Sequence, residues 1–244
     1  LFRSVIAPDD TPYACTCPSC TAIGNTEKNA TPAVTELILR LSQRFPRHFF
    51  FTTSYLTTQQ VTDKQLPPNA GVIVSAINFP LRRIDGKDAK EKAFAGQLEQ
   101  WKNVTKNIYI WDYINNFDDY LTPMPILKIA RQRLQFFKQH GASGIFFNGS
   151  GYSYSSFDEM RTFVLSALLI NPELSVDNLT ASFFNQEYPA AKKWLYDYYT
   201  DLENGTQSGK RLGIYAGIRE SEKAYLTPEK FIKFYDEMNR SEER

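Results

Sequence analysis

The feature that most constrains this chain is a short apolar segment that ends in an acid. Ile108 to Trp111 is an uninterrupted run of β-prone residues, and Asp112 follows it directly. Such a run is typical of a strand that is buried on both faces of a parallel sheet. Functional groups of α/β proteins gather at the carboxyl ends of such strands. We therefore interpret Asp112 as a candidate functional residue; the alternative is a strand-end Asp that caps the following loop.

Four other apolar segments have the same character, and helical patterns separate most of them. Strands are predicted at residues 3–7, 48–53, 71–77, 107–113 and 143–148, and helices at 31–45, 88–104, 126–140 and 156–170. Strands that alternate with helices indicate an α/β fold with a parallel sheet. Two architectures stay open. One is an open doubly wound sheet, and the other is the C-terminal five strands, numbers 4 to 8, of a (β/α)8 TIM-type barrel whose first strands lie upstream of Leu1.

The alternation of strands and helices stops at Asn171 and Pro172. Three helical patterns follow, at about residues 176–188, 189–203 and 227–239, and the segment 205–209, with a glycine at each end, is expected to be a surface loop. The apolar face of each helix needs a partner to be stable. We therefore predict a barrel portion at residues 1–172 and a helical extension at residues 173–244 that packs on the barrel.

Composition and charge argue against several classes of partner. The chain has 244 residues and a formal net charge of +1, with both signs interspersed, so nucleic acid and anionic membranes are not expected partners. The longest strongly apolar run, Phe163 to Ile170, is far shorter than the roughly 18 residues of a membrane-spanning helix. No export signal begins at Leu1, so we expect any such signal to have been removed or to lie outside this sequence.

All three cysteines lie close together, at Cys15, Cys17 and Cys20. Three thiolates can bind zinc, but a structural zinc site uses four protein ligands. The histidines, His48 and His140, are far away in the sequence. The sequence therefore favours a local disulfide with one thiol left over, or free cysteines. We predict no metal and no cofactor, and the zinc alternative stays open.

Carboxylates are the remaining candidates for acid and base catalysis, because neither histidine is placed to activate a Ser or Cys nucleophile. Glycoside hydrolysis uses two carboxylates that flank one bond. Asp9 and Asp10 follow the first predicted strand, and Asp112 follows the fourth. If these are barrel strands 4 and 7, Asp10 and Asp112 face each other across the barrel mouth. The alternative is that Asp9 and Asp10 form an Asx-type turn.

Further side chains near the predicted strand ends are candidates for holding a sugar, since aromatic rings stack on its apolar face. The candidates for substrate binding are Asp9, Tyr55, Trp111, Tyr113, Asn148 and Tyr152. The loop 148–152 is alternatively a phosphate-binding loop. It has glycines but no Lys or Arg within reach, so an ordinary loop is favoured.

Several motifs together resemble one known family. The matching segments are Pro8-Asp9-Asp10 with Cys15-x-Cys17-x-x-Cys20, residues 108–113, Pro123-Met124-Pro125, residues 144–147 with the following glycine loop, and residues 171–177 with the helices at 183–199. They cover most of residues 3–203. The family is domain of unknown function 4838, found in secreted, polysaccharide-associated proteins of Bacteroidetes.

The resemblance implies the last five strands of a glycosidase-like barrel, similar in outline to α-glucuronidases and hexosaminidases. It also implies a periplasmic or extracellular location, possible anchoring as a cell-surface lipoprotein, and further domains in a longer parent chain. By position it marks Asp10 and Asp112 as the acids to test, whereas Asn148 stands where relatives often carry Glu or Gln. The expected function is hydrolysis of a polysaccharide or oligosaccharide by the two carboxylates. The alternative is a non-catalytic glycan-binding module on the same barrel.

Overall fold

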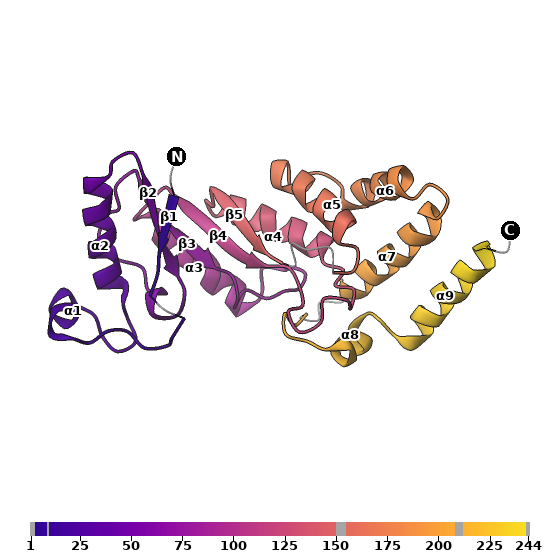
Figure 1. The fold of residues 1–244 in the computed structure, drawn as a ribbon, viewed down its shortest axis with the longest axis horizontal. Coiled ribbons are helices and arrows are strands. Elements are labelled where there is room, and N and C mark those ends of the chain that lie inside the picture. The colour runs from indigo at the N-terminus through magenta and orange to yellow at the C-terminus, as the bar shows by residue number, and fades with distance from the viewer. Residues whose placement is uncertain (1–2, 9, 150–154, 208–211, 243–244) are drawn as a thin grey trace. The chain divides into compact units, whose positions relative to one another are not determined.

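The computed structural model describes residues 3–8, 10–149, 155–207 and 212–242 (Figure 1). The chain divides into two compact units, each described by itself below. The first comprises residues 1–79, 87–112 and 137–147, and the second comprises residues 80–86, 113–136 and 148–244. The predicted boundary between residues 172 and 173 stays a prediction.

Five strands form one sheet in the order of the sequence. The strands are β1 (Arg3–Ile6), β2 (Phe49–Ser54), β3 (Ala70–Ser75), β4 (Ile108–Tyr113) and β5 (Gly144–Asn148). The pairs β1–β2, β2–β3 and β3–β4 are parallel. Sequential parallel strands with helices between most of them form the curled half of a barrel, so the α/β fold class is confirmed.

Most predicted helices are present within a few residues of their expected ends. They are α2 (Thr31–Arg44), α3 (Ala89–Lys102), α4 (Leu127–Gln139) and α5 (Asp158–Ile170). Asp88 caps α3, because its carboxylate accepts a hydrogen bond from the backbone N–H of Lys90 at 2.7 Å. The helix α1 (Pro18–Ile23) was not predicted, since six residues are too short for a periodic apolar pattern. The β2–β3 connection carries only a 3-10 turn, η1 (Leu56–Thr58).

In the first unit, α2 and α3 cover one face of the sheet. Ile38 of α2 packs in a cluster with Phe50 and Ala70. Trp101 of α3 donates a hydrogen bond from its Nε1 to the Oγ of Ser54 at 3.2 Å. Ser54 is in register with Val74 of β3, which is in register with Ile110 of β4. Because side chains alternate along a strand, these contacts define the helix-covered face for all three strands.

The opposite face of the sheet, called the open face below, carries aromatic rings. Phe51 and Tyr109 meet edge to face, with ring centroids 5.1 Å apart. Two glycines make room for them. A Cβ at Gly71 would lie 2.7 Å from the Phe51 ring, and a Cβ at Gly144 would lie 2.5 Å from the Tyr109 ring. The rings therefore lie directly against the backbones of β3 and β5.

The second unit is mainly helical. After α5 it contains α6 (Val176–Glu187), α7 (Lys192–Thr206), α8 (Ile218–Ala224) and α9 (Pro228–Glu242). The ring of Phe157 contacts Phe184 and Tyr199, at centroid distances of 6.4 and 5.2 Å, which joins α6 to α7. In the part of the chain that the structure describes, no helix has the length and apolar character needed to cross a membrane.

The loop predicted at residues 205–209 is wrong in its first two residues, because α7 continues through Gly205 to Thr206. Glycine is needed here for space. A Cβ at Gly205 would lie 2.8 Å from the Cβ of Tyr225, so the helix can pass that residue only without a side chain. The helix α8 was not predicted, since it is only seven residues long.

Candidate functional site

Asp112 lies in β4 and is completely buried, with 0% of its surface exposed. The strand alternates: Ile108 and Ile110 are buried, while Tyr109 and Trp111 are partly exposed. The prediction that both faces are buried is therefore wrong for residues 108–111, whereas Asp112 and Tyr113 are both buried. Alternation places Asp112 on the helix-covered face with Ile110, and Trp111 on the open face.

Asp10 lies in a bend that follows β1, and its side chain is exposed. It belongs to the same unit as Asp112. A saccharide in solution can reach Asp10 but not the buried Asp112 in this conformation. Their assignment as an acid and base pair stays a prediction. Asp9 lies outside the described residues.

Tyr55 and Trp111 are brought together on the open face. Their ring centroids are 5.8 Å apart, with 54° between the ring planes, and both side chains are partly exposed. Tyr55 follows β2 directly, and its carbonyl accepts hydrogen bonds from the N–H and the hydroxyl of Thr58, at 2.9 and 3.0 Å. The next residue, Leu56, has a φ of 45°, in the left-handed region that β-branched and bulky residues avoid. The turn thus holds the Tyr55 ring beside Trp111.

Two other predicted sugar-binding residues belong to the second unit. Tyr113 is only 6% exposed, and its ring meets that of Phe117 edge to face at 6.1 Å. Tyr113 is therefore part of a core. Asn148 ends β5, and its carbonyl accepts a hydrogen bond from the N–H of Ile114 at 3.1 Å. Tyr152 lies outside the described residues.

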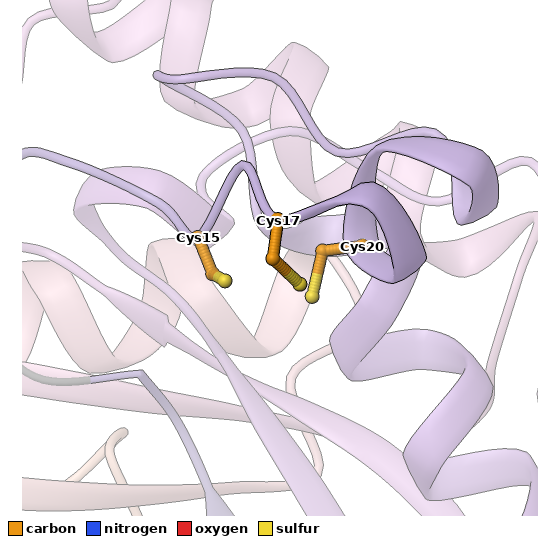
Figure 2. Close-up of side chains that lie close together, drawn as sticks. All are labelled: Cys15, Cys17 and Cys20. Atoms are coloured by element: carbon orange, nitrogen blue, oxygen red, sulfur yellow. The ribbon is translucent and has the colours of Figure 1, made fainter.

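The three cysteines form a cluster in the first unit (Figure 2). The sulfur atoms of Cys15, Cys17 and Cys20 all lie within 4.8 Å of one another. Hydrogen bonds from the Cys20 backbone N–H and from the neighbouring thiols lower the pKa of Cys17. Hydrogen bonding to the Cys17 and Cys15 sulfurs raises the pKa of Cys20 to about 11. The sequence shows that the three cysteines are close along the chain, whereas the structure shows that their side chains point toward one another.

A buried ionic cluster in the second unit was not anticipated from the sequence. Glu203 of α7 is 1% exposed, and its Oε2 accepts a hydrogen bond from the backbone N–H of Lys128 at 3.0 Å, at the start of α4. Burial raises the pKa of Glu203 to about 7. Arg161 of α5 is 4% exposed and donates hydrogen bonds to the Asn115 side chain and the Ile114 carbonyl, at 3.0 and 2.6 Å. The Glu203 contact joins α7 to α4, and the Arg161 contacts join α5 to the segment after β4, so we interpret the cluster as structural.

A cavity of about 740 Å³ is also present in the second unit. Its lining is mostly apolar and includes Phe157, Tyr198 and Phe231, with the carboxylates of Asp119 and Glu222. None of the predicted site residues in the described part of the chain lines it. The cavity therefore lies apart from the residues that the sequence marked.

A model of the family described as a domain of unknown function (DUF4838) matches residues 2–201, which is most of the chain. A search of curated proteins gave no match. Since the description of the family names no activity, the function has to be argued from the residues themselves.

Proposed function

This chain belongs to the family described as a domain of unknown function (DUF4838), and from that premise we propose that it binds a saccharide on the open face of its sheet. The observation that carries the proposal is the pair of partly exposed rings, Tyr55 and Trp111, at the carboxyl end of that face. We further propose that the sheet is strands 4 to 8 of a glycosidase-like (β/α)8 barrel, in a longer chain that acts in the periplasm or outside the cell.

The exposure of the open face supports the barrel assignment. Val5 of β1 is in register with Phe51, and 54% of its surface is exposed. A parallel sheet is normally covered on both faces, so an apolar side chain on either face is expected to be buried. In a closed barrel the face opposite the helices is the interior. Further strands that complete the barrel would cover Val5 while they leave the carboxyl ends of the strands accessible.

The arrangement around Trp111 suits a sugar ring. The C–H groups of a pyranose present an apolar face that stacks on aromatic rings, and its hydroxyls need hydrogen-bond partners. Tyr55 and Trp111 offer two ring surfaces inclined at 54°. Ser75 is partly exposed and in register with Trp111, so its hydroxyl lies on the same face. Rings and a hydroxyl together give both kinds of contact.

Hydrolysis is the second candidate function, and the exposed Asp10 beyond β1 favours it. General acid or base catalysis needs a carboxyl group within hydrogen-bond reach of the reacting bond. Asp112 is 0% exposed, so turnover by Asp10 and Asp112 requires a rearrangement that opens the site around β4. Binding needs no such step. We therefore propose binding first and hydrolysis by this pair second.

Binding is tested by titrating soluble plant and host oligosaccharides into the chain and measuring affinity by calorimetry. Replacing Tyr55 or Trp111 by Ala is expected to weaken binding about tenfold, or roughly 1.4 kcal/mol, through loss of ring stacking. Tyr235→Ala is a matched control, since Tyr235 lies on α9 and is 51% exposed. Equal affinities for the wild type and the Trp111→Ala variant, with unchanged melting temperatures, would refute the aromatic platform.

Hydrolysis is tested with the same oligosaccharides by product analysis after prolonged incubation. If Asp10 and Asp112 form the catalytic pair, Asp10→Asn and Asp112→Asn each abolish turnover and leave affinity intact. If the chain only binds, every oligosaccharide stays whole in the wild type. Turnover that survives Asp10→Asn would exclude the proposed pair without affecting the binding proposal.

A further inference from the structure

The three thiol side chains converge on one point, although they come from different parts of the backbone. Cys15 lies in the loop before α1, Cys17 is the residue that caps α1, and Cys20 is in the first turns of that helix. Their sulfur atoms are all within 4.8 Å of one another, and Figure 2 shows the side chains directed to the same side of the loop. A disulfide joins two sulfurs and needs no third. Three sulfur atoms that point to one position can all bind the same metal ion.

The backbone around the cysteines is fixed by Asn25, a residue that is only 5% exposed. Its side-chain amide donates a hydrogen bond to the carbonyl of Cys15 at 3.2 Å, and its backbone N–H donates to the carbonyl of Cys20 at 3.0 Å. Its side-chain oxygen accepts from the N–H of Ala33 in α2, at 3.0 Å. One buried residue therefore ties both ends of the cysteine segment to a helix of the first unit.

Two further contacts close the segment. Gly24 ends α1 with a φ of 113°, a left-handed conformation that turns the chain toward Asn25. The N–H of Ala14, just before Cys15, donates a hydrogen bond to the carbonyl of Glu27 at 2.8 Å. The loop is thus held by contacts that do not involve the sulfurs. Ligands held in place in this way lose little conformational freedom when they bind an ion.

We propose that Cys15, Cys17 and Cys20 bind one thiophilic metal ion, with Zn²⁺ as the test ion. Thiolates favour zinc and copper(I) over magnesium and calcium. Zn²⁺ replaces the protons of the three thiols, so three protons leave for each ion bound, and three Zn–S bonds form. A solvent molecule completes the tetrahedral coordination. Three protein ligands and one open position distinguish this site from a closed structural zinc site.

The sequence alone disfavoured metal because it offers no fourth protein ligand. The open position removes that objection, since zinc sites with three protein ligands are a known class. All three sulfurs lie at or near the surface, with Cys15 and Cys17 exposed. An exogenous ligand can therefore reach the ion. The proposal is independent of saccharide binding, which involves Tyr55 and Trp111.

The test uses the whole chain, fully reduced with a phosphine and handled without oxygen. Co²⁺ serves as the spectroscopic probe and Zn²⁺ as its competitor. One ion per chain is expected, with a strong near-ultraviolet absorption from sulfur-to-cobalt charge transfer that Zn²⁺ abolishes. Replacing any one of the three cysteines by Ser should weaken Zn²⁺ binding at least about tenfold, because each thiolate is a direct ligand.

Ser19→Ala is the matched control, because Ser19 is exposed and lies between two of the ligands. It should leave the cobalt spectrum and the Zn²⁺ affinity unchanged. The cysteine replacements change surface residues, so circular dichroism is expected to show an intact fold. The proposal is overturned if the reduced chain gives no charge-transfer band, or if the band is unchanged in any single Cys→Ser variant. A stable disulfide that resists the reductant, seen as a mass two units below the reduced chain, would also overturn it.

Discussion

Replacing Glu203 by Gln is expected to change how the stability of this protein depends on pH. Glu203 is buried in the second unit, and burial raises its pKa from 4.5 to about 7. The charged groups that act on it are Lys128 of α4, Asp177 of α6 and Arg161 of α5, with the hydroxyl of Tyr199 on its own helix. Burial also raises the pKa of Tyr199 and lowers that of Arg161. The raised pKa of Glu203, at about 7, lies in the range that the assay below covers.

The direction follows from the raised pKa of Glu203. The folded chain keeps its proton up to about pH 7, while the unfolded chain loses it near pH 4.5. The contribution of Glu203 to stability is therefore fully present below pH 4.5 and is lost as the pH rises to 7. A pKa difference of this size corresponds to about 3 kcal/mol in the free energy of unfolding. Gln is neutral throughout and keeps an oxygen that can accept the hydrogen bond from Lys128.

The assay is urea unfolding of the wild type and the variant at several pH values from 5 to 8. We expect Glu203→Gln to be less than about 1 kcal/mol more stable than the wild type at pH 5, and up to about 3 kcal/mol more stable at pH 8. Glu187→Gln is the control, since Glu187 is exposed at the end of α6. Stability curves that run parallel for wild type and Glu203→Gln would refute the assignment of a raised pKa to this buried carboxyl.

Two further predictions concern the first unit. Gly144→Ala should destabilise the chain by about 1–3 kcal/mol in urea unfolding, because the new Cβ would lie 2.5 Å from the Tyr109 ring. Gly96→Ala is the control. A Cβ at Gly96 on α3 would meet open space, so this substitution should be neutral or stabilising. Equal effects of the two substitutions would contradict this packing. Asp88→Ala should lower the stability by about 1 kcal/mol, because the N-cap hydrogen bond to the Lys90 N–H of α3 is lost. Asp88→Asn should retain most of the stability, because Asn can also accept this bond. Thermal unfolding of the three proteins measures the difference.

Local sequence patterns were sufficient to predict the strands and the longer helices of this fold. These patterns involve only residues that are close together in the sequence. Examples are Thr31 and Pro32 at the start of α2, the apolar spacing along α2, and the runs of Val, Ile and Phe in the strands. Whether a segment is a helix or a strand can therefore be predicted without knowing its tertiary contacts. The short helices α1 and α8 were missed, since they contain too few residues to form a periodic pattern. The cysteines were found for the same local reason, whereas the direction of their sulfurs depends on how Asn25 holds the loop.

Which side chains share a face was decided only by tertiary structure. Along β4 the side-chain direction reverses at every residue, so Trp111 on the open face and Asp112 on the helix-covered face differ by a single step. The sequence places both at the strand end but cannot say which face the helices will cover. The same holds for Glu203, which is buried and accepts a hydrogen bond from the start of α4, 75 residues earlier in the chain. Periodicity is a property of neighbours in the sequence, while burial and charge environment depend on the packing of distant elements.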